Sequence, residues 1–161
     1  MSETETSIAG GCQCGAVRYR ANSVLADAHI CHCRMCQKAV GNAFAALVAL
    51  PREALTWTRG TPAIFYSSDQ VARGFCADCG TPLFYDFVDG KRVNLTIGSL
   101  DNPAEFPPLE QFGTEAKLDW FATLPGLHDV GTTEETMAGP APAIKASNRQ
   151  HPDHDTDSWP L

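Results

Sequence analysis

The stretch HICHCRMCQK, residues 29–38, carries three cysteines within six positions, and the other cysteines of the chain lie in two equally short motifs. GGCQCGAVRY (residues 10–19) holds a Cys-x-Cys pair, and GFCADCGTPLF (residues 74–84) holds a Cys-x-x-Cys pair followed directly by glycine. Every cysteine therefore belongs to a cluster. The seven are Cys12, Cys14, Cys31, Cys33, Cys36, Cys76 and Cys79.

The length and composition restrict what these thiols do. A chain of 161 residues is long enough to bury a hydrophobic core, so it does not need disulfide bonds to stay folded. No apolar run approaches the length of a membrane span, and the opening MSETETSIAG is acidic and polar, so we expect a cytoplasmic protein without membrane contact. In a reducing cytosol, seven cysteines indicate metal ligation or redox chemistry.

The net charge of −7 argues against a nucleic-acid partner. Neither part of the chain offers the basic stripe that a phosphate backbone requires. Residues 1–125 carry −3, and the remainder carries −4 because six acids outnumber two bases there. Those acids are Asp129, Glu134, Glu135, Asp153, Asp155 and Asp157, against Lys145 and Arg149.

Residue patterns predict a mostly β chain. GAVRYRA (residues 15–21) and RVNLTI (residues 92–97) alternate apolar with polar side chains, and NAFAALVAL (residues 42–50) is an apolar run that favours a strand. An Asp-Gly dipeptide at residues 89–90 separates LFYDFV (residues 83–88) from RVNLTI, which predicts an antiparallel hairpin.

Signals for helices are few. We expect one or two helical turns near Met35–Val40. A second short helix is predicted after Asp101, whose carboxylate is suited to cap NPAEF (residues 102–106).

The pattern ends near Leu127. Residues 128–161 are rich in Thr, Ala, Pro and acids and show no apolar period, so we predict a zinc-binding domain at 1–127 and a flexible acidic tail at 128–161. His151 and His154 of that tail are able to bind a metal weakly, but we expect solvated polypeptide there.

Two cysteine pairs, Cys12 with Cys14 and Cys76 with Cys79, are enough to close a four-thiolate site. Sulfurs bound at about 2.3 Å to a tetrahedral zinc lie about 3.8 Å apart, a separation that both Cys-x-Cys and Cys-x-x-Cys reach easily. Spacing alone also permits mixed pairings among the three motifs. We favour a structural zinc that ties the first motif to the third.

The remaining triplet, Cys31, Cys33 and Cys36, offers three ligands and one vacant position, the pattern of a catalytic zinc. A fourth ligand such as His29, His32 or Asp78 would make it a second structural site. His32 is disfavoured because its side chain leaves an extended segment on the face opposite Cys31 and Cys33. Redox use is the less favoured reading because neither Cys-x-x-Cys lies in a βαβ pattern, and haem attachment is excluded because no histidine follows either motif.

The ordered motifs resemble the glutathione-dependent formaldehyde-activating enzyme family of carbon-sulfur lyases. The resemblance rests on GGCQCGAVRY, CHCRMCQK, GFCADCGTPLFY, GSLD (residues 98–101) and WFATLPGL (residues 120–127), and it runs from about Gly10 to Leu127. It implies a β-tent fold of several short antiparallel sheets with few short helices. It also implies the same division into a structural zinc and a catalytic zinc at the triplet.

One stretch departs from the family pattern. PLEQFGTEAKLDW (residues 108–120) has Glu110 and Gln111 where family members often carry a histidine and an aromatic residue, which leaves the substrate open.

The chemistry expected at the triplet follows from charge. Three thiolates give a zinc site of net charge −1, which is suited to hold an incoming thiol as thiolate. Such a thiol, glutathione or a similar one, would add to formaldehyde or another small aldehyde, or be released from the adduct. The bases nearest in sequence, expected to bind substrate carboxylates or to offset thiolate charge, are Arg34, Lys38 and Arg73. The alternative is a non-catalytic zinc module that serves as a scaffold for a protein partner.

Overall fold

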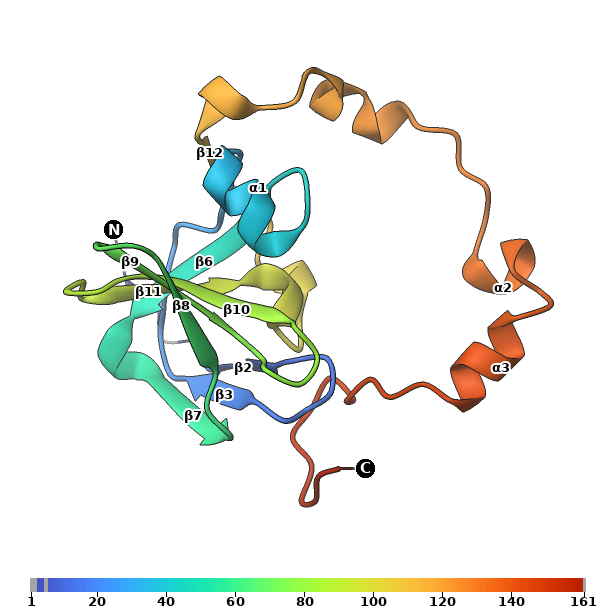
Figure 1. Ribbon diagram of the computed structural model, residues 1–161, viewed down its shortest axis with the longest axis horizontal. Coiled ribbons are helices and arrows are strands. Elements are labelled where there is room, and N and C mark those ends of the chain that lie inside the picture. Colours follow the sequence, from blue (N-terminus) through green and yellow to red (C-terminus); the bar gives the residue numbers. More distant parts are fainter. Residues whose placement is uncertain (1–2, 5, 161) are drawn as a thin grey trace.

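Three β-sheets build the folded body in the computed structural model, which describes residues 3–4 and 6–160 (Figure 1). Within these residues, a seven-stranded sheet has the order β12-β5-β6-β11-β10-β9-β8, a three-stranded sheet has the order β2-β3-β7, and β1 pairs with β4. The mostly β class predicted from the sequence is confirmed.

The elements have the following bounds. The strands are β1 (Glu3–Thr4), β2 (Ile8–Gly11), β3 (Arg18–Ala21), β4 (Val24–Leu25), β5 (His29–Cys31), β6 (Ala45–Pro51), β7 (Leu55–Arg59), β8 (Ala63–Ser68), β9 (Val71–Phe75), β10 (Pro82–Phe87), β11 (Arg92–Thr96) and β12 (Glu110–Phe112). The α-helices are α1 (Arg34–Val40), α2 (Thr133–Thr136) and α3 (Ala141–Ala146). The 3-10 turns are η1 (Arg52–Ala54), η2 (Ile97–Ser99), η3 (Pro103–Glu105), η4 (Thr114–Ala116) and η5 (Asp119–Gly126).

Neighbouring strands of the large sheet pair mainly antiparallel. β10 and β11 run antiparallel with Tyr85 opposite Asn94, which confirms the hairpin predicted from the Asp-Gly dipeptide. β9 pairs with both β8 and β10, again antiparallel. The exception is β12, which pairs parallel with β5 and places Phe112 opposite Cys31. This pairing brings the stretch that departs from the family pattern next to the cysteine triplet.

The main core lies between the two larger sheets. Tyr19 of β3 is fully buried there, and its hydroxyl forms a 2.6 Å hydrogen bond with the hydroxyl of Ser99. Cys12 and Cys76 belong to this core, whereas Cys36 belongs to a small separate cluster with Ala45 and Leu47. The two groups of cysteines therefore rest on different parts of the hydrophobic interior.

Arg18 is a buried cation held by two carboxylates. Its guanidinium donates hydrogen bonds of 2.8 and 2.7 Å to Asp101 and of 3.0 and 2.8 Å to Asp155. Such pairing is what a charge requires when it is removed from water. The predicted helix cap at Asp101 was wrong: Asn102 precedes the short turn η3, and the Asp101 carboxylate is used by Arg18 instead.

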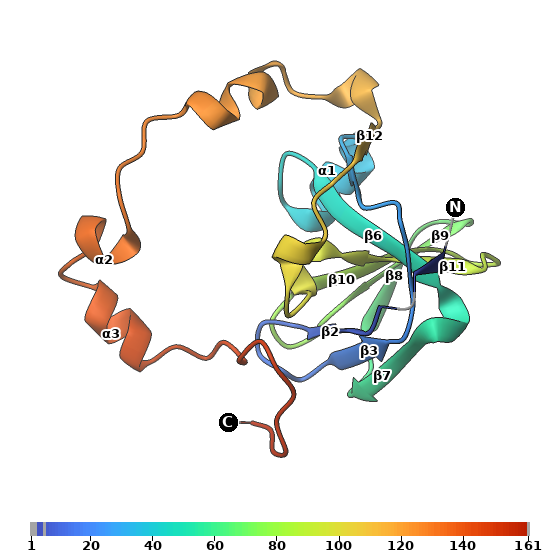
Figure 2. The same cartoon turned by 180° about the vertical axis from the view of Figure 1, so that it is seen from behind.

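The segment after Leu127 leaves the body in a wide arc that includes α2 and α3 and then returns to it (Figures 1 and 2). Residues 127–149 are exposed apart from the half-buried Ala141. The chain then contacts the first cysteine motif, where the backbone N–H of His151 donates to the Gln13 carbonyl at 2.6 Å and the Trp159 indole N–H donates to the Cys14 carbonyl at 2.6 Å.

His151 is only 5% exposed, so the expectation of a solvated histidine was wrong there. Its ring packs against Gly15, and its Nε2 lies 3.0 Å from the Thr156 hydroxyl. The domain boundary after residue 127 and the flexibility of the tail stay predictions. No helix in the described part of the chain is long and apolar enough to cross a membrane.

Candidate metal centres

The first centre joins the turn after β2 to the turn after β9. The sulfurs of Cys12 and Cys14 lie 3.6 Å apart, and that of Cys14 lies 3.8 Å from Cys76. All four Sγ atoms of Cys12, Cys14, Cys76 and Cys79 lie within 4.8 Å of one another.

A tight turn presents Cys76 and Cys79 together. The Gly80 N–H donates to the Cys76 carbonyl at 2.9 Å, and Gly80 has φ of 77°, a conformation that glycine adopts without steric cost. The Cys76 N–H in turn donates to the Thr81 carbonyl at 3.0 Å. The glycine that directly follows the third motif is therefore part of the turn that presents both thiols.

This arrangement fits a tetrahedral metal ion. The S–S separations match those of four thiolates about 2.3 Å from a common centre, and they far exceed the length of a disulfide bond. Burial acts to raise the pKa of the Cys79 thiol, but hydrogen bonds from the Thr81 hydroxyl and backbone outweigh it and lower the pKa to about 6. Cys79 is therefore prepared to act as a thiolate ligand.

The second centre is the triplet at the junction of β5 and α1. Cys31 ends β5, Cys33 is the residue before α1, and Cys36 lies in the first turn of the helix. The Cys36 N–H donates to the Cys33 sulfur at 3.4 Å, and the three sulfurs lie within 4.8 Å of one another. Within the described residues, no histidine, carboxylate or further cysteine joins this group.

His32 does not complete the triplet, as its place in an extended segment predicts. Its side chain is fully buried between Phe44 and Phe121, with ring centroids 6.0 and 4.7 Å away. Neither ring nitrogen has a hydrogen-bond partner within the described structure. His29 instead directs Nδ1 at the Asp27 carbonyl oxygen, 2.7 Å away.

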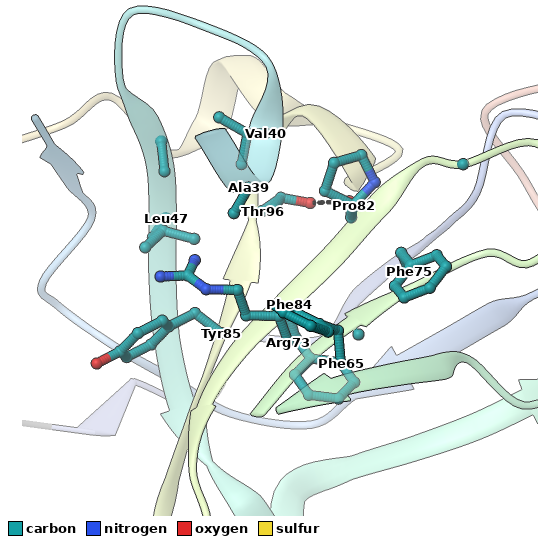
Figure 3. A pocket seen from close by; sticks show the side chains of 13 residues that line it. Ala39, Val40, Leu47, Phe65, Arg73, Phe75, Pro82, Phe84, Tyr85 and Thr96 are labelled. Atoms are coloured by element: carbon teal, nitrogen blue, oxygen red, sulfur yellow. Dashed lines mark hydrogen bonds between the residues drawn. The ribbon is translucent and has the colours of Figure 1, made fainter. Parts of the chain in front are cut away.

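Arg73 of β9 is the cation that reaches the triplet. Its guanidinium NH2 group lies 3.6 Å from the Cys36 sulfur, and its Nε donates to the Ser67 hydroxyl at 3.1 Å. The same group lies over the Tyr85 ring, 5.0 Å from its centroid. Figure 3 shows the guanidinium extending across the sheet toward Leu47. Arg73 is therefore placed to offset thiolate charge.

The other two bases expected at the site lie on α1. Arg34 donates to the Gln37 side chain at 3.0 Å, and Lys38 is exposed in the last turn of the helix. Neither lines the cavity next to the triplet. Their role in substrate binding stays a prediction.

A cavity of about 820 Å³, called here the triplet cavity, lies against all three cysteines. Most of its wall is apolar, and its charged groups besides Arg73 are Asp27, Lys91, Arg92 and Glu110. Of these, the sequence had singled out Glu110 alone, as a departure from the family pattern. Lys91 directly precedes β11, Arg92 starts it and Glu110 starts β12, so strand pairing, and not a local sequence signal, brings them to the cavity. Such a cavity is large enough to hold a molecule the size of a drug or cofactor.

A mostly β body with two cysteine clusters that could each hold a metal ion, one of them facing a cavity, defines a small β-protein with two candidate metal centres. The model of the family described as glutathione-dependent formaldehyde-activating enzyme matches residues 7–115, and the chain belongs to this family. No curated protein sequence matches the chain significantly.

Among solved structures, a crystal structure of a Rhodobacter sphaeroides protein is similar in fold, with a TM-score of 0.53 and 22% sequence identity. The alignment covers 64% of this chain and 98% of that one. The segment beyond residue 115, which supplies Phe121 and the returning residues 150–159, lies outside the family match.

Proposed function

We propose that the protein is a zinc-dependent carbon-sulfur lyase that joins a thiol to a small aldehyde, or cleaves such an adduct, at the triplet. The observation that carries this proposal is the contrast between the two cysteine clusters. The four-cysteine cluster offers four thiols, enough for a tetrahedral metal ion, whereas the triplet offers three and borders a cavity of about 820 Å³. Family membership supports the same reaction class.

Zinc is the metal that the donor sets fit best, and when bound at the triplet it would supply a position that holds a thiol as thiolate near neutral pH. Cys31, Cys33 and Cys36 would be its protein ligands, and Cys12, Cys14, Cys76 and Cys79 would hold a structural ion. Glutathione is the thiol that the family suggests.

The residues around the triplet would control charge and orientation. Arg73 lies beside Cys36 and reduces the excess negative charge of three thiolates. Lys91 at the wall of the triplet cavity is placed to attract substrate carboxylates, whereas the neighbouring Arg92 already lies 3.6 Å from the Asp27 carboxylate. The cavity would hold the thiol so that its sulfur remains next to the triplet.

The test measures exchange between glutathione, labelled formaldehyde and their hydroxymethyl adduct by NMR, with two zinc ions per chain confirmed beforehand. We expect the wild-type protein to accelerate exchange over the uncatalysed rate, and Cys33→Ser to lose the acceleration while it keeps one zinc. Glu53→Gln, an exposed change in η1, is the matched control. Two zinc ions that are equally inert to chelators, with no acceleration, would instead favour the non-catalytic zinc module.

A further inference from the structure

A second cavity continues the triplet cavity along the same face of the seven-stranded sheet. Side chains two residues apart on a strand share one face, so Phe75, Arg73 and Val71 of β9 point the same way. Phe75 lines the second cavity, Val71 lines the triplet cavity, and Arg73 lines both. Leu47 and Tyr85 are also shared. The two cavities are therefore neighbours with a common wall.

This second cavity, called here the apolar cavity, has a volume of about 410 Å³. Its wall is formed mainly by Val40, Phe65, Phe75, Pro82 and Phe84, which surround it in Figure 3. Of the described residues on this wall, Tyr85 and Thr96 carry side-chain hydroxyls, and that of Thr96 already donates to the Pro82 carbonyl at 2.7 Å. Among the described lining residues, Arg73 is the one charged group, so a ligand here would be apolar with a single polar end at Arg73.

The common wall is also where the reacting atoms would meet. The Arg73 guanidinium extends toward Leu47 between the cavities (Figure 3), and its NH2 group lies 3.6 Å from the Cys36 sulfur. Because Cys36 also lines the triplet cavity, the triplet is next to the end of the apolar cavity. A reaction of two substrates requires two binding spaces that open onto one centre, which is the arrangement found here.

We propose that the carbonyl substrate is an aldehyde with an apolar body, a branched alkyl or phenyl group, which occupies the apolar cavity with its oxygen at Arg73. This proposal rests on the proposed function and adds to it the class of aldehyde. Formaldehyde has no side chain to remove from water, so it would leave the apolar wall unused.

The step balances without an oxidant or reductant. The thiol releases its proton to water, the sulfur lone pair forms the new C–S bond, and the π electrons of the carbonyl move to oxygen. That oxygen accepts a hydrogen bond from Arg73 as its charge develops and then takes up a proton from water. The product is a hemithioacetal, and the reverse reaction returns thiol and aldehyde.

The binding test needs no turnover. The probe is 3-methylbutanamide, an unreactive amide with the shape of 3-methylbutanal, and the readout is the perturbation of backbone NMR signals of the zinc-loaded protein. We expect it to perturb residues of the apolar cavity in the wild-type protein, and formamide not to do so. Ala39→Trp, a change at an exposed residue that lines the cavity, should abolish binding, whereas Glu53→Trp on η1 should not. Absence of binding to the wild-type protein would overturn the proposal.

The kinetic test separates this inference from the proposed function. With glutathione as thiol, Ala39→Trp should lower kcat/KM for 3-methylbutanal by about tenfold or more and leave formaldehyde within about twofold. Arg73→Gln should slow both aldehydes. Acceleration with formaldehyde together with no response of 3-methylbutanal to Ala39→Trp would refute the apolar-aldehyde site alone. Absence of acceleration with either aldehyde, when both zinc ions are bound, would refute the proposed function and this aldehyde assignment with it.

Discussion

Removing one ligand from each cysteine cluster should destabilise the protein to different degrees. Cys79→Ser and Cys33→Ser form a matched pair because both thiols are partly exposed and both changes replace sulfur with oxygen. The four-cysteine cluster links Cys14 to Cys76 across 62 positions, whereas the triplet spans five, from Cys31 to Cys36. The entropic free-energy cost of closing a loop of n residues grows as (3/2)RT ln n. Losing the longer link should therefore lower the free energy of unfolding by about 2 kcal/mol more than losing the shorter one.

For a chain of 161 residues, this difference corresponds to a melting temperature about 4–8 °C lower for Cys79→Ser than for Cys33→Ser. The assay is thermal unfolding followed by circular dichroism, with zinc per chain measured on the same samples. Cys33→Ser should lose one zinc and unfold near the wild-type temperature. Equal losses of stability, or a Cys79→Ser protein that stays folded with both zinc ions, would refute the division into a structural and an open site.

Three further outcomes follow from the returning C-terminal segment. Gly15→Ala should destabilise the protein by about 1–3 kcal/mol in chemical denaturation, because Gly15 has φ of 79° and an added methyl group would overlap the His151 ring. Asp155→Asn should cost about 1 kcal/mol in the same assay, since Arg18 keeps its other carboxylate partner. Partial burial acts to raise the pKa of Asp155, but hydrogen bonds from Arg18 and Arg20 outweigh it and hold that pKa below its ordinary value of 3.8. Ionised Asp155 therefore contributes fully to the free energy of unfolding above pH 3.8, and this contribution is lost as the pH falls through the lowered pKa of the folded protein. The difference in unfolding free energy between wild type and Asp155→Asn should therefore shrink as the pH is lowered.

Local signals in the sequence predicted the cysteine clusters and much of the sheet. The three cysteine motifs could be recognised because ligand spacing within each motif is short-range, and the β10–β11 hairpin could be predicted because an Asp-Gly turn fixes its own geometry. Spacing alone also permitted mixed pairings, and the structure brings the first motif together with the third across 62 positions. The predicted turn near Met35 was also right, as α1 shows.

Contacts between residues far apart in the chain, both strand pairs and ion pairs, account for the site features that could not be predicted from the sequence. Glu110 reaches the triplet cavity only because β12 pairs parallel with β5, about 80 positions earlier in the chain, and no local pattern encodes that register. Asp101 looked like a helix cap because the competing partner, Arg18, lies 83 positions away. Lys91 and Arg92 lie more than 50 positions after the triplet in sequence, and strand pairing places them at its cavity.

The contact between residues 150–159 and the first cysteine motif has a consequence for the order of events during synthesis. The ribosome completes all seven cysteines well before it makes the segment that lies against Gln13 and Cys14. The four-cysteine cluster is therefore open to an incoming metal ion from more directions before residues 150–159 are made than after they have docked. Docking of residues 150–159 restricts this access, so a metal ion loaded early would exchange more slowly once this segment is in place.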